Sequence, residues 1–445
     1  MKNKYVVFLA ILPLALSGCS HMPSWLGGPK EEKPKAVGER FAVLPVGEDM
    51  KTDEALQKVP MVLPQPTENT SWPAHSLQVN ATAANLAGAG HLEIVTHVTI
   101  GDGREYSHTR VAKPVVADGV VYAMDASGNI SAHDAVDIRK IIWQKPGVSE
   151  EDHPDMLGGG LAVDQDKLYA VSGHGVVAAF DTKTGKEIWK KTMHVPFRSA
   201  PRVDGDKLFI VSIENQLFAL NAATGDILWN QRGIDEVAGL MNSVSPVVSQ
   251  GVVVVPYSSG ELYALSENDG AEIWKDSLAV SSQTPSSSPF SGIGGDPVVD
   301  DKVVFGISSG GFLSVYGLPN GQHLWQKPIS SNNTPWLAGD YLFVLTSDDA
   351  LICFVKFDGR VRWTKQLDSF ANMEEKKDPI VWRGPVLVNG NLTVVGSNGQ
   401  MLLVSATDGK TVDTKSIPED IYTAPVVASG RIYLVSQDAT LYELQ

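Results

Sequence analysis

SPVVSQGVVVVPYSSGELYALSENDGAEIWKD, residues 245–276, contains four short apolar runs separated by turn residues. Gly251 stands at the first turn, residues 258–260 at the second and residues 268–270 at the third. Runs of this length, bounded by Gly, Ser and Asn, are typical of strands joined by tight hairpins. The stretch therefore predicts four antiparallel strands.

The same pattern recurs along the chain. Pro246 and Trp274 are 28 positions apart, and the pairs Pro201–Trp229, Pro297–Trp325 and Pro335–Trp363 repeat that interval. Successive tryptophans of the pattern lie 38 to 51 positions apart, in or near the range of four-stranded propeller blades. The sequence predicts an all-β fold, an eight-bladed β-propeller of four-stranded antiparallel blades.

The last copy, which begins at Pro425, stops after three strands and needs a fourth from elsewhere. Residues 93–100 are rich in β-branched residues and precede the first copy. We expect them to pair with Thr440–Leu444 and close the ring, which leaves no open sheet edge. Trp72 is followed by Pro73, which would interrupt a ladder, so we expect Trp72 to pack against the outside of the closing blade.

The N-terminus resembles a secretory signal, with Lys2 and Lys4 before a short apolar run. The segment LSGC resembles the lipobox of bacterial lipoproteins, which implies acylation of Cys19; an ordinary signal cut nearby is the alternative. Ser20 after the cysteine resembles lipoproteins sent to the outer membrane, where the chain would face the periplasm. We therefore expect a signal peptide (1–18), a lipid-anchored, mostly disordered tether (19–70) and the propeller (71–445).

Two apolar islands interrupt this tether, at residues 41–44 and 61–63, and whether they dock on the propeller is left open. The formal net charge of −15 argues against a broad nucleic-acid-binding surface, because the phosphates would be repelled. The chain has two cysteines, Cys19 and Cys353, which exclude a disulfide framework.

Six tryptophans end the fourth strands and are expected to dock between neighbouring blades: Trp143, Trp189, Trp229, Trp274, Trp325 and Trp363. With the turns before them they form an A-x-D-x-x-T-G-x-x-x-W pattern that resembles the tryptophan-docking motif of quinoprotein-type (PQQ-like) propellers. Quinoprotein dehydrogenases hold pyrroloquinoline quinone beside Ca²⁺, with a disulfide between adjacent cysteines. Cys353 stands alone in an apolar strand and no carboxylates cluster, so we predict no catalytic, cofactor-binding or metal-binding residues and no enzyme.

The phrases DKLFIVSIENQLFALNAATGDILW and GPVLVNGNLTVVGSNGQMLLVSATDGKTV resemble blades of the BamB family, lipoproteins of the outer-membrane β-barrel assembly machinery. The resemblance implies a scaffold that binds the periplasmic domains of the insertase BamA, with other assembly-complex lipoproteins and unfolded outer-membrane proteins as further partners. The alternative is a periplasmic quinoprotein-like enzyme or sensor that binds a quinone or another ligand.

Three inter-blade connections are long, with 16 residues before Pro246, 22 before Pro297 and 21 before Pro385. Long connections in compact domains are often functional. They supply the predicted partner-binding residues Leu240, Met241, Asn242, Phe290, Ile293, Asp296, Trp382 and Arg383, whose apolar members we expect to be exposed unless they fold back onto the blades. The resemblance implies that residues 238–242 contact the insertase through leucine and arginine; Leu240 matches, and Met241 stands where arginine is expected.

Overall fold

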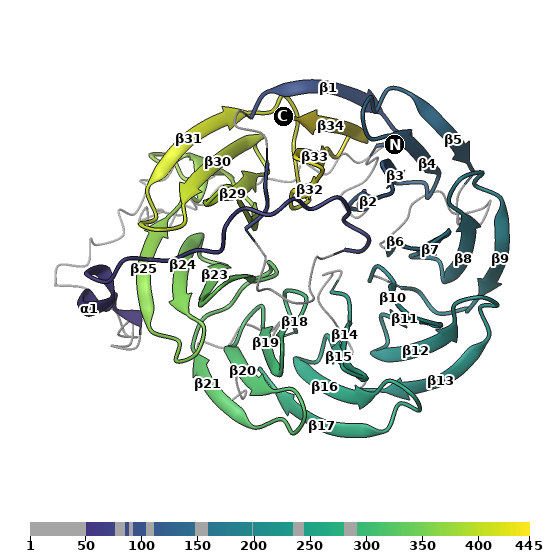
Figure 1. The fold of residues 1–445 in the computed structure, drawn as a ribbon, viewed down its shortest axis with the longest axis horizontal. Coiled ribbons are helices and arrows are strands. Elements are labelled where there is room, and N and C mark those ends of the chain that lie inside the picture. Colours follow the sequence, from purple (N-terminus) through teal and green to yellow (C-terminus); the bar gives the residue numbers. More distant parts are fainter. Residues whose placement is uncertain are drawn as a thin grey trace, which may run out of the picture. The chain divides into compact units, whose positions relative to one another are not determined.

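A computed structural model describes residues 50–75, 85–88, 92–103, 111–146, 159–197, 199–234, 244–279 and 292–445. Within these ranges the chain forms eight four-stranded antiparallel sheets around a ring, together with one two-stranded hairpin and one short helix, α1 (Glu54–Gln57) (Figure 1). The eight-bladed propeller predicted from the repeats is confirmed. No helix in the described ranges is long and apolar enough to cross a membrane.

The blades are numbered in chain order, and each runs from an inner to an outer strand (Figure 1). The first four blades are β2 (Val115–Ala117), β3 (Val120–Met124), β4 (Ile130–Asp134) and β5 (Ile141–Lys145); β6 (Gly159–Asp164), β7 (Lys167–Ser172), β8 (Val176–Asp181) and β9 (Glu187–Thr192); β10 (Arg202–Asp204), β11 (Lys207–Val211), β12 (Gln216–Asn221) and β13 (Ile227–Arg232); and β14 (Val247–Ser249), β15 (Val252–Pro256), β16 (Glu261–Ser266) and β17 (Glu272–Ser277).

The remaining strands complete the ring and include the hairpin between blades 6 and 7. They are β18 (Val298–Asp300), β19 (Val303–Ile307), β20 (Leu313–Gly317) and β21 (His323–Lys327); β22 (Trp336–Ala338), β23 (Tyr341–Leu345), β24 (Ala350–Val355) and β25 (Val361–Gln366); the hairpin β26 (Phe370–Asn372) and β27 (Lys377–Pro379); β28 (Trp382–Val388), β29 (Asn391–Gly396), β30 (Gln400–Ser405) and β31 (Thr411–Ser416); and β32 (Val426–Ala428), β33 (Arg431–Val435), β34 (Thr440–Leu444) and β1 (Ile94–Thr99).

Blade 8 takes its outer strand from the N-terminal side of the propeller, as the sequence predicts. Strand β1 pairs with β34, with Thr99 opposite Thr440 and Ile94 opposite Leu444. Glu93 and Gln445 extend this ladder by exchanging two backbone hydrogen bonds of 2.9 Å. The ring is therefore closed by segments from opposite ends of the propeller sequence.

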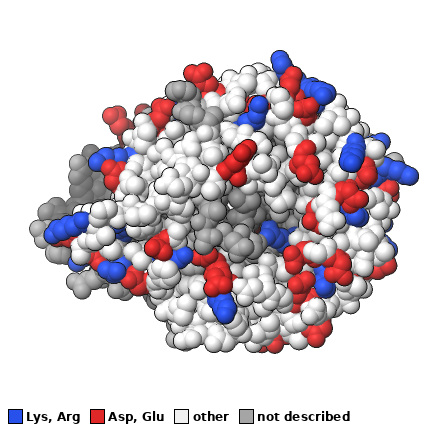
Figure 2. All heavy atoms as spheres, viewed as in Figure 1, with Lys and Arg blue, Asp and Glu red and all other residues white. Residues whose placement is uncertain are grey.

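The antiparallel order of each blade gives the ring two faces. One, the turn face, carries the turns between first and second strands and between third and fourth strands, such as Gly251 and Gly270. The other, the loop face, carries the turns between second and third strands and the connections between blades. Figure 2 shows acidic and basic side chains interspersed around a central hollow, without a broad basic area.

Each of the six tryptophans packs on the next blade. Its indole Nε1 donates to a backbone oxygen there: Trp143 to Thr182 (2.8 Å), Trp189 to Ala222 (3.1 Å), Trp229 to Glu267 (3.2 Å), Trp274 to Leu318 (2.7 Å), Trp325 to Lys356 (2.9 Å) and Trp363 to Ala406 (2.8 Å). The ring lies against the turn glycine of that blade: at Gly270, a Cβ atom would stand 2.6 Å from Trp229. Tryptophan and glycine therefore act as a pair across each of these interfaces.

The two interfaces of blade 8 lack this pair. Blade 7 has Asp413 where blades 1–6 have tryptophan, the outer strand β1 of blade 8 contains no tryptophan, and the turn of blade 1 after Asp134 contains no glycine before Ile141. Between blades 8 and 1, the Tyr433 hydroxyl instead donates to the Ala135 backbone oxygen at 3.1 Å. Blade 8 therefore depends on other contacts to hold its place.

Residues 50–75, here called the strap, supply such contacts. The strap begins at the rim of blade 6, where Thr52 forms a parallel bridge with Val361 and Arg362 donates to the backbone oxygens of Leu56 and Val59 at 2.7 Å each. From α1 it runs toward the centre of the ring (Figure 1). Residues 50–70, predicted as part of the tether, therefore lie against the propeller, and the second apolar island docks, since Met61 and Leu63 pack against the main core. Residues 19–49 of the predicted tether lie outside the described residues.

Further along, the strap enters the central channel. Asn69 donates to the Val427 backbone oxygen of blade 8 at 2.7 Å and accepts from the Ser429 backbone N–H at 2.6 Å. Trp72 forms an antiparallel bridge with Val116 on the inner strand of blade 1 and stacks on Trp336 of blade 6. The expectation that Trp72 packs outside the closing blade is wrong, because the inner strands present open edges to the channel and the strap pairs with them.

Candidate partner interface

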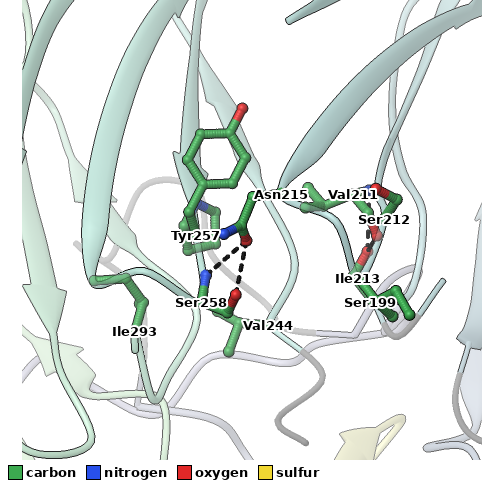
Figure 3. Close-up of a pocket in the computed structure, with 10 residues that line it drawn as sticks. Ser199, Val211, Ser212, Ile213, Asn215, Val244, Tyr257, Ser258 and Ile293 are labelled. Atoms are coloured by element: carbon green, nitrogen blue, oxygen red, sulfur yellow. Dashed lines mark hydrogen bonds between the residues drawn. The ribbon is translucent and has the colours of Figure 1, made fainter. Parts of the chain in front are cut away.

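A small pocket opens on the loop face between blades 3 and 4 (Figure 3). Its volume is about 40 Å³, and Ser199, Ser212, Asn215, Val244, Tyr257 and Ile293 are among the residues that line it. Organic cofactors occupy pockets of roughly 300–1,000 Å³. The pocket therefore suits one small side chain of a partner and is too small for a quinone.

Asn215 fixes the shape of this pocket. It lies in the turn between β11 and β12 with a φ of 56°, and its Oδ1 accepts from both the backbone N–H and the hydroxyl of Ser258, at 2.9 Å each. Its Nδ2 donates to the Ile234 backbone oxygen at 2.8 Å. One buried side chain thus ties blade 3 to blade 4 and to the connection between them.

Two aliphatic side chains are exposed around Asn215. Ile213 belongs to the pocket wall and Ile234 follows β13, with exposed fractions of 37% and 58%. Hydroxyl and amide groups within the pocket and aliphatic groups around it form a mixed surface. Such a composition is typical of a protein-binding site with a polar surround.

The predicted partner-binding residues Leu240, Met241, Asn242 and Phe290 lie outside the described residues. The chain is described again from Val244 and from Gly292, and Val244 and Ile293 both line the pocket. Both segments that supply these predicted residues therefore lead directly into it.

The expectation that Ile293 is exposed is wrong. Its exposed fraction is 3%, and its backbone bridges to Ser308. Phe197 and Ile421 make the same bridge to Ser212 and Ser436. Each of the three residues precedes the proline of its blade by four positions and occupies the equivalent buried position there.

Asp296 is also buried and does not belong to the partner-binding surface on which it was expected. Its carboxylate accepts from the Ser245 backbone N–H at 2.8 Å and pairs with His75 Nδ1 of the strap at 2.9 Å. Its own backbone N–H donates to the Thr334 hydroxyl at 3.1 Å. Asp296 thus links the strap with blades 4, 5 and 6 at the loop-face end of the channel.

Trp382 is buried as well, and its indole Nε1 donates to the Asp368 backbone oxygen at 2.8 Å. Arg383 is partly exposed, and its guanidinium donates to the backbone oxygens of Tyr422 and Asn332. Both residues therefore organise the loop face between blades 6, 7 and 8.

Lys113 lies near Asp296 in the channel and was not predicted from the sequence. Its ammonium donates to the His75 backbone oxygen at 2.9 Å and lies 5.7 Å from the centre of the Trp72 ring. Burial lowers the pKa of Lys113 to about 8; Asp296 opposes this shift and Arg383 adds to it. The strap thus covers a cationic group.

The residues present do not fit the quinone site of a dehydrogenase. Cys353 is a free thiol buried in β24, so it forms no disulfide of the kind that the dehydrogenases carry, and burial raises its pKa. Within the described ranges, no three His, Cys, Asp or Glu side chains gather closely enough to hold a metal ion.

The fold and its repeats define a class, the β-propellers built of PQQ-like repeats. A family model described as outer membrane protein assembly factor BamB matches residues 126–365 and 367–445. Outer membrane protein assembly factor BamB of Escherichia coli (strain K12) is 33% identical over 355 residues, covering 78% of this chain and 87% of that protein. The protein of the same name from Yersinia pestis is 28% identical over 353 residues, covering 78% of this chain and 86% of that protein. The chain belongs to the outer membrane protein assembly factor BamB family.

Solved structures share the fold. BamB from Moraxella catarrhalis matches 80% of this chain and all of its own, with a TM-score of 0.68 and 17% identity. A europium-containing methanol dehydrogenase matches 86% of this chain and 90% of its own, with a TM-score of 0.65 and 13% identity. At these identities the likeness concerns the fold alone.

Proposed function

We propose that this protein is a non-enzymatic scaffold of outer-membrane protein assembly, and that it binds the periplasmic domains of a BamA-type insertase through the loop face at blades 3 and 4. The observation that carries the proposal is the pocket between these blades, with Ile213 and Ile234 exposed around Asn215. The names of the relatives, outer membrane protein assembly factor BamB, support the assembly role.

The contact we propose has a central apolar part and a polar surround. Leu240 and Met241, with Asn242 and Phe290, are proposed to supply side chains beside the pocket, because both segments lead into it. A buried leucine or methionine anchor contributes about 2 kcal/mol or more at a binding hot spot. A few such residues would dominate the affinity.

Co-purification of the insertase from solubilised outer membrane tests this interface. Leu240→Asp with Met241→Asp is expected to abolish co-purification, and Ile213→Asp with Ile234→Asp to weaken it, because each places charge where apolar contact is needed. Ile188→Asp is the matched control, since Ile188 is exposed to a similar extent on outer strand β9. Retained binding in both double variants with unchanged melting temperatures would refute the placement.

We further propose that acylation of Cys19 anchors the protein to the outer membrane, facing the periplasm. Other lipoproteins of the assembly complex and unfolded outer-membrane proteins are proposed as additional partners. Reconstitution with pyrroloquinoline quinone and Ca²⁺ tests the non-enzymatic part: a bound quinone absorption band with dehydrogenase activity would overturn it.

A further inference from the structure

The corner of blade 6 on the turn face carries strongly exposed apolar side chains. Val59 and Val62 of the strap and Phe357, in the turn between β24 and β25, have exposed fractions of 55%, 77% and 67%. Large apolar groups gathered on one surface of a soluble domain mark a contact site.

The backbone around these three residues is fixed by hydrogen bonds. The Val59 backbone oxygen accepts from Arg362, and the Lys356 backbone N–H donates to the Asp340 oxygen at 2.9 Å. The Val62 backbone oxygen lies 3.9 Å from the position that a Cβ atom of Gly339 would take, next to Asp340. The strap and the two turns of blade 6 therefore form one ordered surface.

This corner carries little net charge, although the whole protein carries −15. Residues 50–62 and the turns 339–340 and 356–360 contain four positive charges (Lys51, Lys58, Lys356 and Arg360) and four negative charges (Asp53, Glu54, Asp340 and Asp358). Lys356, whose ammonium lies 5.0 Å from the Phe357 ring centre, is paired with Asp300 at 2.7 Å. An anionic surface would therefore repel this corner less strongly than it repels the protein as a whole.

The chain reaches this corner directly from the proposed anchor. Met50 packs against the core of blades 5 and 6, as Trp325 does, and Trp325 donates to the Lys356 backbone oxygen. Cys19 and Met50 are 31 positions apart (50 − 19). Among the described residues, Met50 is the one nearest to Cys19 in sequence, so the chain from the proposed anchor joins the described part of the propeller at this corner.

We propose that the blade-6 corner, formed by Val59, Val62 and Phe357, contacts the lipid surface of the membrane that holds Cys19. The inference rests on the anchor proposed above. Apolar side chains enter the boundary between headgroups and acyl chains, and aromatic rings favour that depth. The turn face is then directed toward the bilayer at blade 6, and the loop face with its partner pocket is directed away from it.

Spin-label accessibility on proteoliposomes tests this contact. The full-length lipidated protein carries a nitroxide at Phe357→Cys and is bound to vesicles of phosphatidylethanolamine and phosphatidylglycerol. Cys353 is fully buried with a raised thiol pKa and is not labelled. The matched control carries the label at Ile213→Cys on the loop face, which is also exposed.

When the protein is bound to vesicles, we expect a water-soluble nickel chelate to collide several-fold less often with a label at position 357 than with one at position 213. Without vesicles we expect no such difference. Val62→Asp in the labelled protein is expected to restore them, and it should fold because Val62 is the most exposed of the three residues. Equal accessibility at 357 and 213 in protein that floats with vesicles overturns the contact while leaving the anchor intact. Protein that does not float with vesicles refutes the anchor and the contact together.

Discussion

Gly270 and Gly251 belong to the same blade and have nearly the same backbone conformation, with φ values of 73° and 76°. Their surroundings differ, because a Cβ atom at Gly270 would collide with Trp229 whereas one at Gly251 would meet nothing within 4 Å. The turn alone explains Gly251, whereas Gly270 is needed for the turn and for the tryptophan of the preceding blade.

Substitution of these two glycines separates the two roles. Gly251→Ala is expected to lower the free energy of unfolding by about 1–2 kcal/mol, the cost of a left-handed conformation. Gly270→Ala should lower it by a further ~1–3 kcal/mol, because the added methyl displaces the indole ring. Urea unfolding measures both, and equal losses would show that the tryptophan adjusts freely.

Lys113 predicts a pH dependence of stability. The folded protein releases this proton near pH 8, whereas the unfolded chain keeps it up to its ordinary pKa of 10.5. Between these values the unfolded state binds more protons, so stability rises with pH. Because tyrosines titrate in the same range, the measurement is the difference in unfolding free energy between wild type and Lys113→Met. That difference should shift in favour of the wild type from pH 8 to 10.5, and a flat difference would contradict the lowered pKa.

At the scale of elements, the blade strands could be predicted because each repeat carries its own turns and apolar runs. The segment 93–100 could be placed because the last blade was one strand short. The position of the strap could not be predicted, because prolines interrupt any hydrophobic period in it (Pro60, Pro64, Pro66 and Pro73). Its partners are strand edges that exist only in the folded ring. Its burial comes from tertiary structure alone.

The partner residues illustrate a second limit. The 22 residues before Pro297 suggested that Ile293 is exposed, although its place four positions before the proline matches buried Phe197. Comparison between repeats could have found this. Asn215 carried no comparable signal, since its role depends on Ser258 in the next blade.

The strap is expected to stabilise blade 8, which lacks the tryptophan–glycine pairs. Asn69→Ala removes the side-chain hydrogen bond to Val427 of blade 8, and Trp72→Ala removes the buried ring beside the backbone bridge to Val116, which should loosen the strap on blade 1. Trp72→Ala alone should cost ~3–5 kcal/mol as a buried aromatic truncation. Hydrogen exchange followed by mass spectrometry should show faster exchange first in β32 and β2, with β11 and β15 still protected. Uniform loss of protection around the ring would contradict a local role.

At the scale of the whole molecule, we expect the proposed anchor and the propeller to be separable. Cys19→Ala is expected to release the protein into the soluble periplasmic fraction without changing its melting temperature, because the described core begins at residue 50. Fractionation and thermal unfolding of the purified variant measure the two effects. A variant that stays in the membrane fraction would show that acylation is not the main attachment.

The pairing of β1 with β34 also has a consequence for biosynthesis. Ile94 and Leu444 are 350 positions apart (444 − 94), so the strand needed to complete the ring is made early and its partner almost last. Contacts of such long sequence separation form slowly. We expect a chain emerging from a translocation channel to remain unclosed, with the strap undocked, until its final residues have arrived, so that export and ring closure cannot compete.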